Sequence, residues 1–340
     1  MSAIRTGIVG YGLSGRVFHA PFVAANPEFS LEVISTGNAE RAAQARLQHP
    51  GAEIVATAQE LIDRGLDLVV LASPAIAHLE QGLAALGSGA ALVVDKPFAV
   101  SVDQAERLIA AAEAAGRQLI VYQDRRWDGD FRTVERLVRE GALGRVHRFE
   151  SAFERWSPAL RDRWQDTTTW REGAGITFDL GSHLVDQALH LFGPARLERS
   201  ELSILRAGGV SDDEAFLSLR HASGTISHLT LSRMAGQQGP RFRVLGDRAA
   251  YTVYGLDGQE PALMEGASPA DEGFGVVPEE RWGTIGVTGD LRPVPTERGE
   301  YAAFYSGVAA AIRDGARPPV EARDALEALR IIEQAHRGAL

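Results

Sequence analysis

A glycine loop near the start of the chain, Gly10-Tyr11-Gly12-Leu13-Ser14-Gly15, restricts the possible folds more than any other feature. It directly follows the apolar run Thr6–Val9 and precedes a segment of helical composition, Val17–Ala25. Glycines at these spacings allow a tight turn, close approach of the backbone to a pyrophosphate, and close packing of the helix on the strand. Free N–H groups at the helix N-terminus would hold the pyrophosphate. The context favours a dinucleotide site over the alternative, a purely structural turn.

The turn after the expected second strand bears on the choice of cofactor. An acidic residue in this turn would bind both ribose hydroxyls of NAD. The chain instead has Ser35, Thr36 and Gly37, with Glu40 as the nearest acid and Arg41 close by. Hydroxyls and an arginine suit a 2′-phosphate, which an acid would repel. We therefore predict NADP as the cofactor, with NAD as the alternative if this is only a polar turn.

Strand and helix patterns alternate through the first part of the chain. The run Leu66–Ala72 is nearly all apolar, as in a central parallel strand buried on both faces. The alternation predicts an α/β fold with a doubly wound parallel sheet, a Rossmann domain, over residues 1–122. The expected strands are Ile4–Val9, Leu31–Ser35, Leu66–Ala72, Ala91–Val94 and Gln118–Val121, and the expected helices are Val17–Ala25, Ala39–Gln48, Ala58–Arg64, Ile76–Gly87 and Val102–Ala115.

The pattern changes after Tyr122, and we interpret residues 123–340 as an α+β domain with a largely antiparallel sheet. The segment Pro261–Gly299 is rich in glycine, proline and acidic residues, so we expect a long surface excursion there. The expected strands are Val146–Trp156, Ala215–Arg220, Thr225–Ser232, Arg241–Leu245 and Ala250–Val253, and the expected helices are Phe131–Glu140, Tyr301–Arg313 and Ala322–His336.

Composition argues against several classes of protein. The net charge of −10 disfavours nucleic acid as the main partner, because phosphates repel an acidic surface. The chain has no cysteine, which excludes disulfide frameworks, thiolate nucleophiles and cysteine-ligated metals. No secretory signal is visible, and no apolar run approaches the roughly 20 residues that span a bilayer. We expect a soluble, cytoplasmic protein without membrane partners.

A lysine lies where a parallel sheet presents its ligands. Lys96 belongs to the motif Asp95-Lys96-Pro97, which directly follows the apolar run Ala91–Val94. Its ammonium is therefore expected at the carboxyl edge of a buried strand, where open α/β sheets bind ligands. There it would orient a substrate hydroxyl and stabilise a developing alkoxide, with Asp95 as its partner. The alternative is a strand-end lysine that extends to solvent.

The end of the central strand lies at the same edge of the predicted sheet. Ser73 and Pro74 end this strand, so we include them in the cofactor site. His78 follows one turn into the next helix, and either contacts the nicotinamide ribose or lies on the helix surface. The same two alternatives hold for His19, just past the glycine loop.

Asp179 and His183 are one helical turn apart at the start of a helix, so they can share a face. Removal of a hydride from an alcohol requires loss of the hydroxyl proton, which His183 can accept near neutral pH. Asp179 would bind an adjacent hydroxyl or tune the lysine. Two alternatives are a purely structural pair and a metal site that adds Asp186 and His190.

Two groups of arginines and aromatic residues are candidates for substrate binding. The first includes Tyr122, Arg125 and Trp127, and the second includes Arg155, Trp156, Arg163 and Trp164. Such side chains bind a polyhydroxylated ring through hydrogen bonds and C–H contacts. They equally suit a network at a domain interface. From both groups, the predicted substrate-binding residues are Tyr122, Arg125, Trp127, Arg155 and Trp164.

The glycine loop, the strand-end Lys96-Pro97 and Asp179-Leu180-Gly181-Ser182-His183 together resemble the Gfo/Idh/MocA family of oxidoreductases. The resemblance implies a Rossmann domain, a C-terminal domain whose open sheet face forms a homodimer or homotetramer, and catalytic roles for Lys96, Asp179 and His183. Asp95 stands where the family usually has glutamate.

Further segments resemble the NADP-dependent scyllo-inositol dehydrogenase branch of this family, which usually has asparagine in place of Asp124. These segments are Phe18-His19-Ala20-Pro21, Arg125-Arg126-Trp127-Asp128, Asp179–Gln187 and Tyr254–Glu260.

These features predict an NADP-preferring enzyme that interconverts a secondary alcohol of an inositol-like polyol or a sugar with its ketone. Lys96, Asp179 and His183 are expected to converge in a cleft between the domains, with His183 as proton acceptor and Lys96 polarising the hydroxyl, or with these two roles exchanged. The alternatives are another sugar or diol dehydrogenase, a non-catalytic NAD(P)-binding redox sensor, and a metal-dependent hydrolase.

Overall fold

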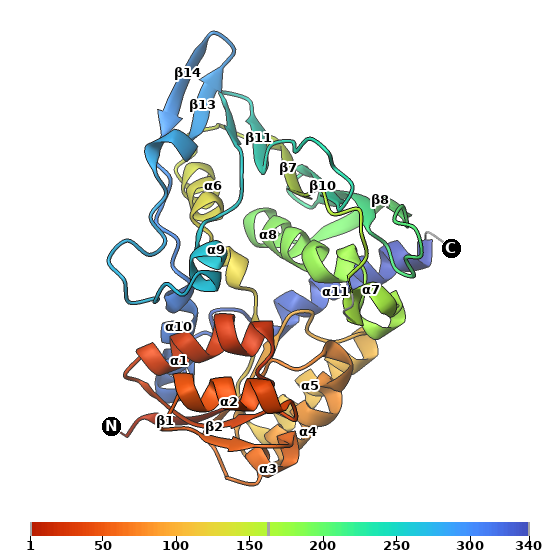
Figure 1. Cartoon of the computed structure of the whole chain (residues 1–340). Helices are drawn as coiled ribbons and strands as arrows, with labels where there is room; N and C mark the ends of the chain where they lie inside the picture. Colours follow the sequence, from red (N-terminus) through yellow and green to blue (C-terminus); the bar gives the residue numbers. More distant parts are fainter. Residues whose placement is uncertain (1, 162–163, 339–340) are drawn as a thin grey trace. The chain divides into compact units, whose positions relative to one another are not determined.

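The computed structural model of the chain describes residues 2–161 and 164–338. These residues form two compact units, each built from several segments (Figure 1). The first unit comprises Met1–Asp124, Gln259–Phe274 and Glu300–Leu326, and the second comprises Arg125–Gly258, Gly275–Gly299 and Glu327–Leu340. The domain boundary that we predict at residues 122 and 123 stays a prediction.

A parallel sheet forms the centre of the first unit, with strand order β3-β2-β1-β4-β5-β6. This confirms the predicted doubly wound sheet. The strand order reverses between β1 and β4, and such a switch point is where open α/β sheets bind ligands. All residues of β4 and β5 are buried, as their apolar runs predict. The strands are β1 (Ile4–Val9), β2 (Phe29–Ser35), β3 (Glu53–Val55), β4 (Leu68–Leu71), β5 (Ala91–Asp95) and β6 (Leu119–Tyr122).

The helices of the first unit mostly match the predicted segments. The predicted helix Val17–Ala25 instead divides into a π-helical turn, η1, and a short α-helix, α1. Pro21 explains the division, because it lacks an N–H group and is favoured only in the first turn of a helix. The helices are η1 (Ser14–His19), α1 (Ala20–Ala25), α2 (Ala39–Gln48), α3 (Ala58–Ile62), η2 (Ala75–Ala77), α4 (His78–Gly87), α5 (Val102–Ala115), α9 (Gln259–Met264) and α10 (Tyr301–Asp314).

The second unit contains a larger sheet with strand order β14-β13-β12-β11-β7-β10-β9-β8. Its pairs are antiparallel except for β7 and β10, which confirms the predicted, largely antiparallel sheet. Phe149, Phe153, Leu229 and Leu231 on β7 and β10 are fully buried and belong to the core. The strands are β7 (Val146–Glu154), β8 (Ala195–Ser203), β9 (Glu214–His221), β10 (Ile226–Ser232), β11 (Phe242–Gly246), β12 (Ala250–Val253), β13 (Gly283–Val287) and β14 (Asp290–Val294).

Helices complete this second unit. The helix α11 begins in the first unit at Ala322 and continues into the second, ending at Gly338. Its His336 stacks on Trp170 within the second unit, with ring centroids 4.8 Å apart. The remaining helices are η3 (Asp124–Trp127), α6 (Gly129–Arg139), α7 (Trp164–Thr167), η4 (Trp170–Glu172), η5 (Thr177–Gly181), α8 (Ser182–Phe192) and η6 (Glu279–Arg281).

The predicted surface excursion Pro261–Gly299 is only partly correct, because it includes the strands β13 and β14. The hairpin continues the sheet beyond β12, where Ile285 pairs with Tyr251 and both side chains are buried. Glycine, proline and aspartate lower strand propensity, so the glycines of β13 and the aspartate and proline of β14 argue against strands in the sequence. The edge strand β8 also escaped prediction, since its alternating charged residues suit an exposed edge as well as a loop.

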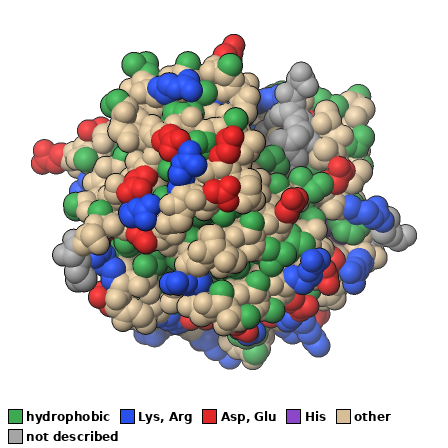
Figure 2. All heavy atoms as spheres, turned by 90° about the horizontal axis from the view of Figure 1, so that it is seen from below, with side chains coloured by type: hydrophobic (Ala, Val, Ile, Leu, Met, Phe, Trp, Pro, Cys, Tyr) green, Lys and Arg blue, Asp and Glu red, His purple; other side chains and the backbone are tan. Residues whose placement is uncertain are grey.

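The described residues also bear on the expectations about membrane spans and about surface charge. Within them, no helix is long and apolar enough to cross a membrane. Over the centre of the face drawn in Figure 2, acidic and basic side chains are interspersed. The cytoplasmic location predicted from the sequence stays a prediction.

Candidate active site

The glycine loop has the geometry that a dinucleotide cradle requires. Gly10 has a φ of +94°, and a Cβ atom added there would lie 2.8 Å from the carbonyl oxygen of Ala72. A Cβ at Gly15 would collide with the carbonyl oxygen of Gly10, so the loop must pack without side chains at both positions. At Gly12, by contrast, an added Cβ would meet only the guanidinium of Arg41, at 3.7 Å. The open space at Gly12 fits a bound pyrophosphate.

Tyr11, inside this loop, faces the protein interior. Its side chain is buried, and its hydroxyl donates to Oε1 of Gln48 at 2.7 Å. Burial raises the pKa of Tyr11 to about 12, although the charge of nearby Arg16 acts in the opposite direction. Leu13 is half exposed in the same loop. A contact between the loop and a cofactor would therefore involve the Tyr11 backbone rather than its phenol.

The end of β2 lies beside the glycine loop, since the N–H of Gly10 donates to the carbonyl of Ser35 at 3.0 Å. Ser35 is buried, whereas Thr36 is only partly so and its hydroxyl accepts a long bond from the N–H of Asn38. The Asn38 side chain caps α2 by accepting from the N–H of Arg41 at 2.9 Å. This cap places the exposed Arg41 at the first turn of α2, with its guanidinium next to Gly12.

The side chain of His78 bridges the segment after β4 and the segment after β5 through hydrogen bonds to their backbone. The buried imidazole has its Nε2 2.9 Å from the carbonyl oxygen of Ser73 and its Nδ1 3.2 Å from that of Phe98. Burial lowers the pKa of His78, while Asp95 and these carbonyls act to raise it. The Ser73 hydroxyl donates to Gln81 at 2.6 Å, and Pro74 is exposed. Contacts of these residues with a cofactor stay a prediction.

Lys96 follows directly on β5, at the carboxyl end of the sheet. Its N–H donates to Oδ1 of Asp95 at 2.7 Å, and its side chain is partly exposed. Lys96 is also the only lysine among the 35 lysines and arginines of the chain. Every other cationic position uses arginine, whose guanidinium stays charged and does not transfer protons. The single lysine of the sequence is therefore a candidate for a role that uses a primary amine, and this signal is present in the sequence alone.

Asp95 is a buried carboxylate beside this lysine. Burial acts to raise its pKa, but His19, the charge of Lys96 and a hydrogen bond from Ser14 outweigh burial, and the pKa of Asp95 is lowered. The group is therefore an anion at neutral pH. It connects the glycine-loop helix η1, through Ser14 and His19, with the end of β5.

In the second unit, Asp179 lies in the π-helical turn η5 and His183 in the first turn of α8. Single π-helical turns are found often at functional sites. Nη2 of Arg233, just after β10, donates to Oδ2 of Asp179 at 2.7 Å. The Arg233 side chain is 6% exposed and that of Asp179 is 27% exposed. The buried guanidinium of Arg233 thus fixes the partly exposed carboxylate of Asp179 in place.

His183 is buried beside the ring of Phe153, which two arginine guanidinium groups also contact. Its ring centroid lies 6.4 Å from that of Phe153 on β7. The guanidinium carbons of Arg125 and Arg241 lie 5.3 and 4.1 Å from the centre of the same ring. Arg241 also donates to Ser151 at 2.6 Å. Sequence reasoning did not find Arg233 or Arg241, because nothing local distinguishes them from surface arginines.

The predicted substrate-binding residues occupy different environments. In the first unit, Tyr122 is buried and its hydroxyl donates to the carbonyl of Phe18 at 2.9 Å. In the second unit, Arg125 is buried, Trp127 is partly exposed and Arg155 is exposed. Arg163 and the side chain of Trp164 lie outside the described residues. Substrate contacts of all these residues, and the convergence of Lys96, Asp179 and His183 on one point, stay predictions.

The additional residues of the alternative metal site have other partners. Arg126 binds both carboxylate oxygens of Asp186, at 2.8 and 2.7 Å. His190 lies 3.0 Å from Glu135. In the part of the chain that the structure describes, no group of three or more histidine and carboxylate side chains is arranged to hold a metal ion.

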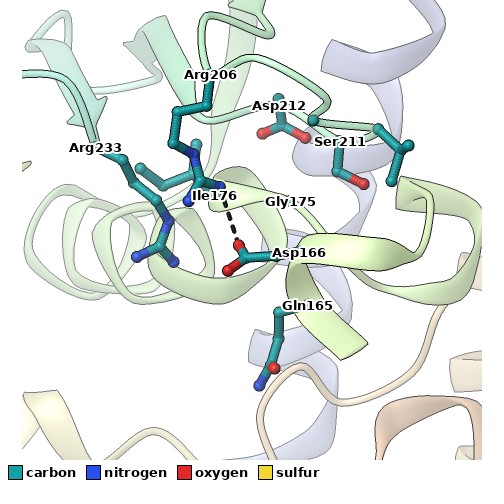
Figure 3. A pocket seen from close by; sticks show the side chains of 10 residues that line it. Gln165, Asp166, Gly175, Ile176, Arg206, Ser211, Asp212 and Arg233 are labelled. Atoms are coloured by element: carbon teal, nitrogen blue, oxygen red, sulfur yellow. Dashed lines mark hydrogen bonds and ion pairs between the residues drawn. The ribbon is translucent and has the colours of Figure 1, made fainter. Parts of the chain in front are cut away.

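A small pocket lies beside η5 (Figure 3). Arg206 and Asp166 line it and form an ion pair at 2.9 Å, and Arg206 also pairs with Asp213 at 2.9 Å. The N–H of Ile176, which precedes η5, donates to the carbonyl of Asp212 at 2.7 Å. Arg233 also lines this pocket. These contacts join the segment around 206–213 to the turn that carries Asp179.

Comparisons with protein families match both parts of the chain. A model of an oxidoreductase family with an NAD-binding Rossmann fold matches residues 4–123. A model of the GFO/IDH/MocA C-terminal domain matches residues 131–252.

Individual proteins are similar over most of their length. A scyllo-inositol 2-dehydrogenase (NADP(+)) of Bacillus subtilis is 33% identical to this chain. The alignment covers 98% of this chain and 93% of that relative. A D-apiose dehydrogenase of Paraburkholderia graminis is 29% identical, covering 81% and 71%. The solved structure of yvaA from Bacillus subtilis has a TM-score of 0.93 at 32% identity, covering 99% of this chain and 96% of its own. An oxidoreductase from Bacillus cereus has a TM-score of 0.87 at 26% identity, covering 98% and 96%.

Proposed function

Because the chain belongs to the Gfo/Idh/MocA family of oxidoreductases, we propose that this enzyme transfers a hydride between NADP and a secondary alcohol of a cyclic polyol or sugar. The observation that carries the proposal is Lys96, the only lysine of the chain, at the carboxyl end of β5. Relatives that act on scyllo-inositol and on D-apiose support a polyhydroxylated, inositol-like or sugar-like substrate.

The chain's own residues account for the proton and charge changes of the reaction. When bound, the nicotinamide supplies the hydride acceptor or donor. We assign His183 to take the hydroxyl proton and Lys96 to polarise the hydroxyl and stabilise the alkoxide. Asp179, held by Arg233 at 2.7 Å, binds a neighbouring hydroxyl of the substrate. If His183 and Lys96 exchange roles, the same three residues still serve one substrate.

The preference for NADP rests on the turn after β2. This turn lacks an acid, and it has the Thr36 hydroxyl and the exposed Arg41 near the glycine loop. A 2′-phosphate gains a charge-assisted contact from Arg41, while the 2′-hydroxyl of NAD gains none.

A single screen tests the proposed activity. The purified enzyme is incubated with NADP or NAD and a panel of inositols, aldoses and other diols, while absorbance of the reduced nicotinamide is followed. We expect turnover with NADP and at least one cyclic polyol or sugar. If the protein binds the cofactor but turns over no compound of the panel in either reaction direction, the proposed dehydrogenase activity is contradicted and a redox sensor is supported.

We also propose a homodimer or homotetramer formed through the outer face of the large sheet. This face carries the Phe216–His228 ring pair, with centroids 5.4 Å apart, and the pair Arg243–Glu150 at 3.1 Å. Rings and paired charges suit a face that is covered by a second copy. Light scattering at micromolar concentration tests this, and a monomer mass would contradict it.

A further inference from the structure

His19 is a buried histidine in the first unit for which the proposed reaction has no role. It ends the π-helical turn η1, directly after the glycine loop, and it is fully buried. Its Nδ1 lies 2.7 Å from the hydroxyl oxygen of Tyr305 on α10. Its Nε2 lies 3.9 Å from Oδ2 of Asp95 on β5, and its ring centroid lies 4.3 Å from that of Tyr122 on β6. The imidazole thus faces the residue next to Lys96.

The partners of His19 place a proton on Nε2. Nε2 is buried and has no hydrogen-bond partner among the described residues, and Asp95 faces it at ion-pair distance. If the ring is neutral, the Tyr305 hydroxyl can donate to Nδ1, which leaves the proton on Nε2. If the ring is charged, both nitrogens carry protons. Only the remaining tautomer would direct a lone pair at the carboxylate, and that arrangement is repulsive.

Asp95 distributes its charge among several groups. Oδ1 accepts the N–H of Lys96, and Ser14 of η1 donates its hydroxyl to the same carboxylate. The Lys96 ammonium, the buried His78 and Tyr305 also lie within electrostatic range of Asp95. A proton on Nε2 of His19 therefore competes with Lys96 for the charge of one carboxylate.

We propose that His19, oriented by Tyr305, is a positioning residue that acts through Asp95 and limits how strongly this carboxylate binds the ammonium of Lys96. This inference rests on the proposed function, which gives Lys96 its catalytic role. The cluster ties the lysine to η1, because Ser14 and His19 both belong to this turn. The cofactor loop and the reactive amine are thereby held by the same carboxylate.

The proposal predicts opposite effects of two substitutions on Lys96. A carboxylate beside an ammonium favours the charged form, so a more available Asp95 raises the pKa of Lys96 and a neutral replacement lowers it. His19→Asn keeps a polar atom near Nδ1 but removes the group at Nε2. It should raise the pKa of Lys96 by about 0.5 to 1 pH unit. Asp95→Asn should lower this pKa by about 1 pH unit or more.

The composition of the chain makes this measurement direct. Because Lys96 is the only lysine, protein produced with [13C]lysine and without added lysines contains one labelled side chain. Titration of its ε-CH2 signal by NMR reports the pKa of Lys96 without substrate or turnover. His19→Gln is the rescue variant, since its amide can donate near the position of Nε2, and it should stay close to wild type.

A matched control separates a specific effect from the loss of any histidine. His190 forms another imidazole–carboxylate pair, with Glu135 at 3.0 Å in the second unit, so His190→Asn should leave the Lys96 signal unchanged. If His19→Asn does not fold, Tyr305→Phe removes one hydroxyl and should shift the pKa of Lys96 in the same upward direction.

An unchanged or lowered pKa of Lys96 in the folded His19→Asn protein, or in Tyr305→Phe where His19→Asn does not fold, would overturn the positioning role. The polyol screen separately decides the proposed activity, because the NMR measurement needs no reaction. An upward shift together with an inactive screen would therefore reject the dehydrogenase and retain the contact between His19, Asp95 and Lys96.

Discussion

Nη2 of Arg233 donates a hydrogen bond to Oδ2 of Asp179 at 2.7 Å, and the Arg233 side chain is almost entirely buried. A carboxylate held in this way keeps its charge and its direction through a reaction cycle. We therefore expect Asp179 to be a binding group with a fixed orientation, and His183 or Lys96 to carry the proton transfer.

We predict that Arg233→Ala lowers kcat/KM by about 100-fold, because a misplaced binding group can cost that much. Arg233→Lys retains the charge but not the geometry of the guanidinium, and should lose less. Steady-state kinetics with a substrate from the screen gives both values. NADP affinity, measured by fluorescence titration, should stay near wild type, and a loss of affinity equal to the loss of activity would argue for general misfolding.

Lys96→Arg tests whether the site needs an amine or only a positive charge. Loss of a positioned acid–base group typically costs on the order of 10²–10⁴ in rate. We expect Lys96→Arg and His183→Ala each to lose activity in this range, with NADP binding nearly intact. Arg64→Lys, at an exposed ion pair with Glu53, is the reverse substitution and should have no effect. Near-normal turnover in Lys96→Arg would refute the role of the amine.

The cofactor preference should depend on Arg41. The substitution Arg41→Ala removes the guanidinium near Gly12. It should weaken NADP binding by about tenfold, which is the contribution of one charge-assisted contact, and leave NAD binding unchanged. Thr36→Asp should go further and favour NAD, because the new carboxylate repels a 2′-phosphate. Equilibrium titration with both nucleotides measures the change. Equal weakening for NADP and NAD in Arg41→Ala would count against a 2′-phosphate contact.

Tyr11 should make stability fall at alkaline pH. Burial raises its pKa from the ordinary value of 10.0 to about 12, so the folded protein retains a proton that the unfolded chain has lost. The resulting stabilisation is fully present below pH 10 and is lost as the pH rises towards 12. Tyr11→Phe removes this effect. In denaturant titrations, the free energy of unfolding of wild type minus that of Tyr11→Phe should decrease between pH 10 and 12. A constant difference would contradict the shift.

Local sequence patterns determined much of the fold and the catalytic candidates. The glycine loop requires Gly10 because its φ is +94°, and Gly15 because a Cβ there would collide with the carbonyl oxygen of Gly10. Both requirements are local, so the spacing of the glycines is readable along the chain. The α2 and α5 helices begin and end at the predicted residues, since the caps at Asn38, Ser101 and Gly116 are local signals. Lys96 was recognisable because four buried apolar residues precede it in β5.

Only the tertiary structure decided which partners these residues meet. The pairs Arg233–Asp179 and His19–Tyr305 join segments that are far apart in the sequence, and no local period links them. Strand β13 likewise depends on pairing with β12, and β14 on pairing with β13. The glycines of β13 and the aspartate and proline of β14 leave these segments with little strand propensity of their own. A side chain's burial and ionic partners arise from packing between distant elements, so they are properties of the fold that the order of residues does not display.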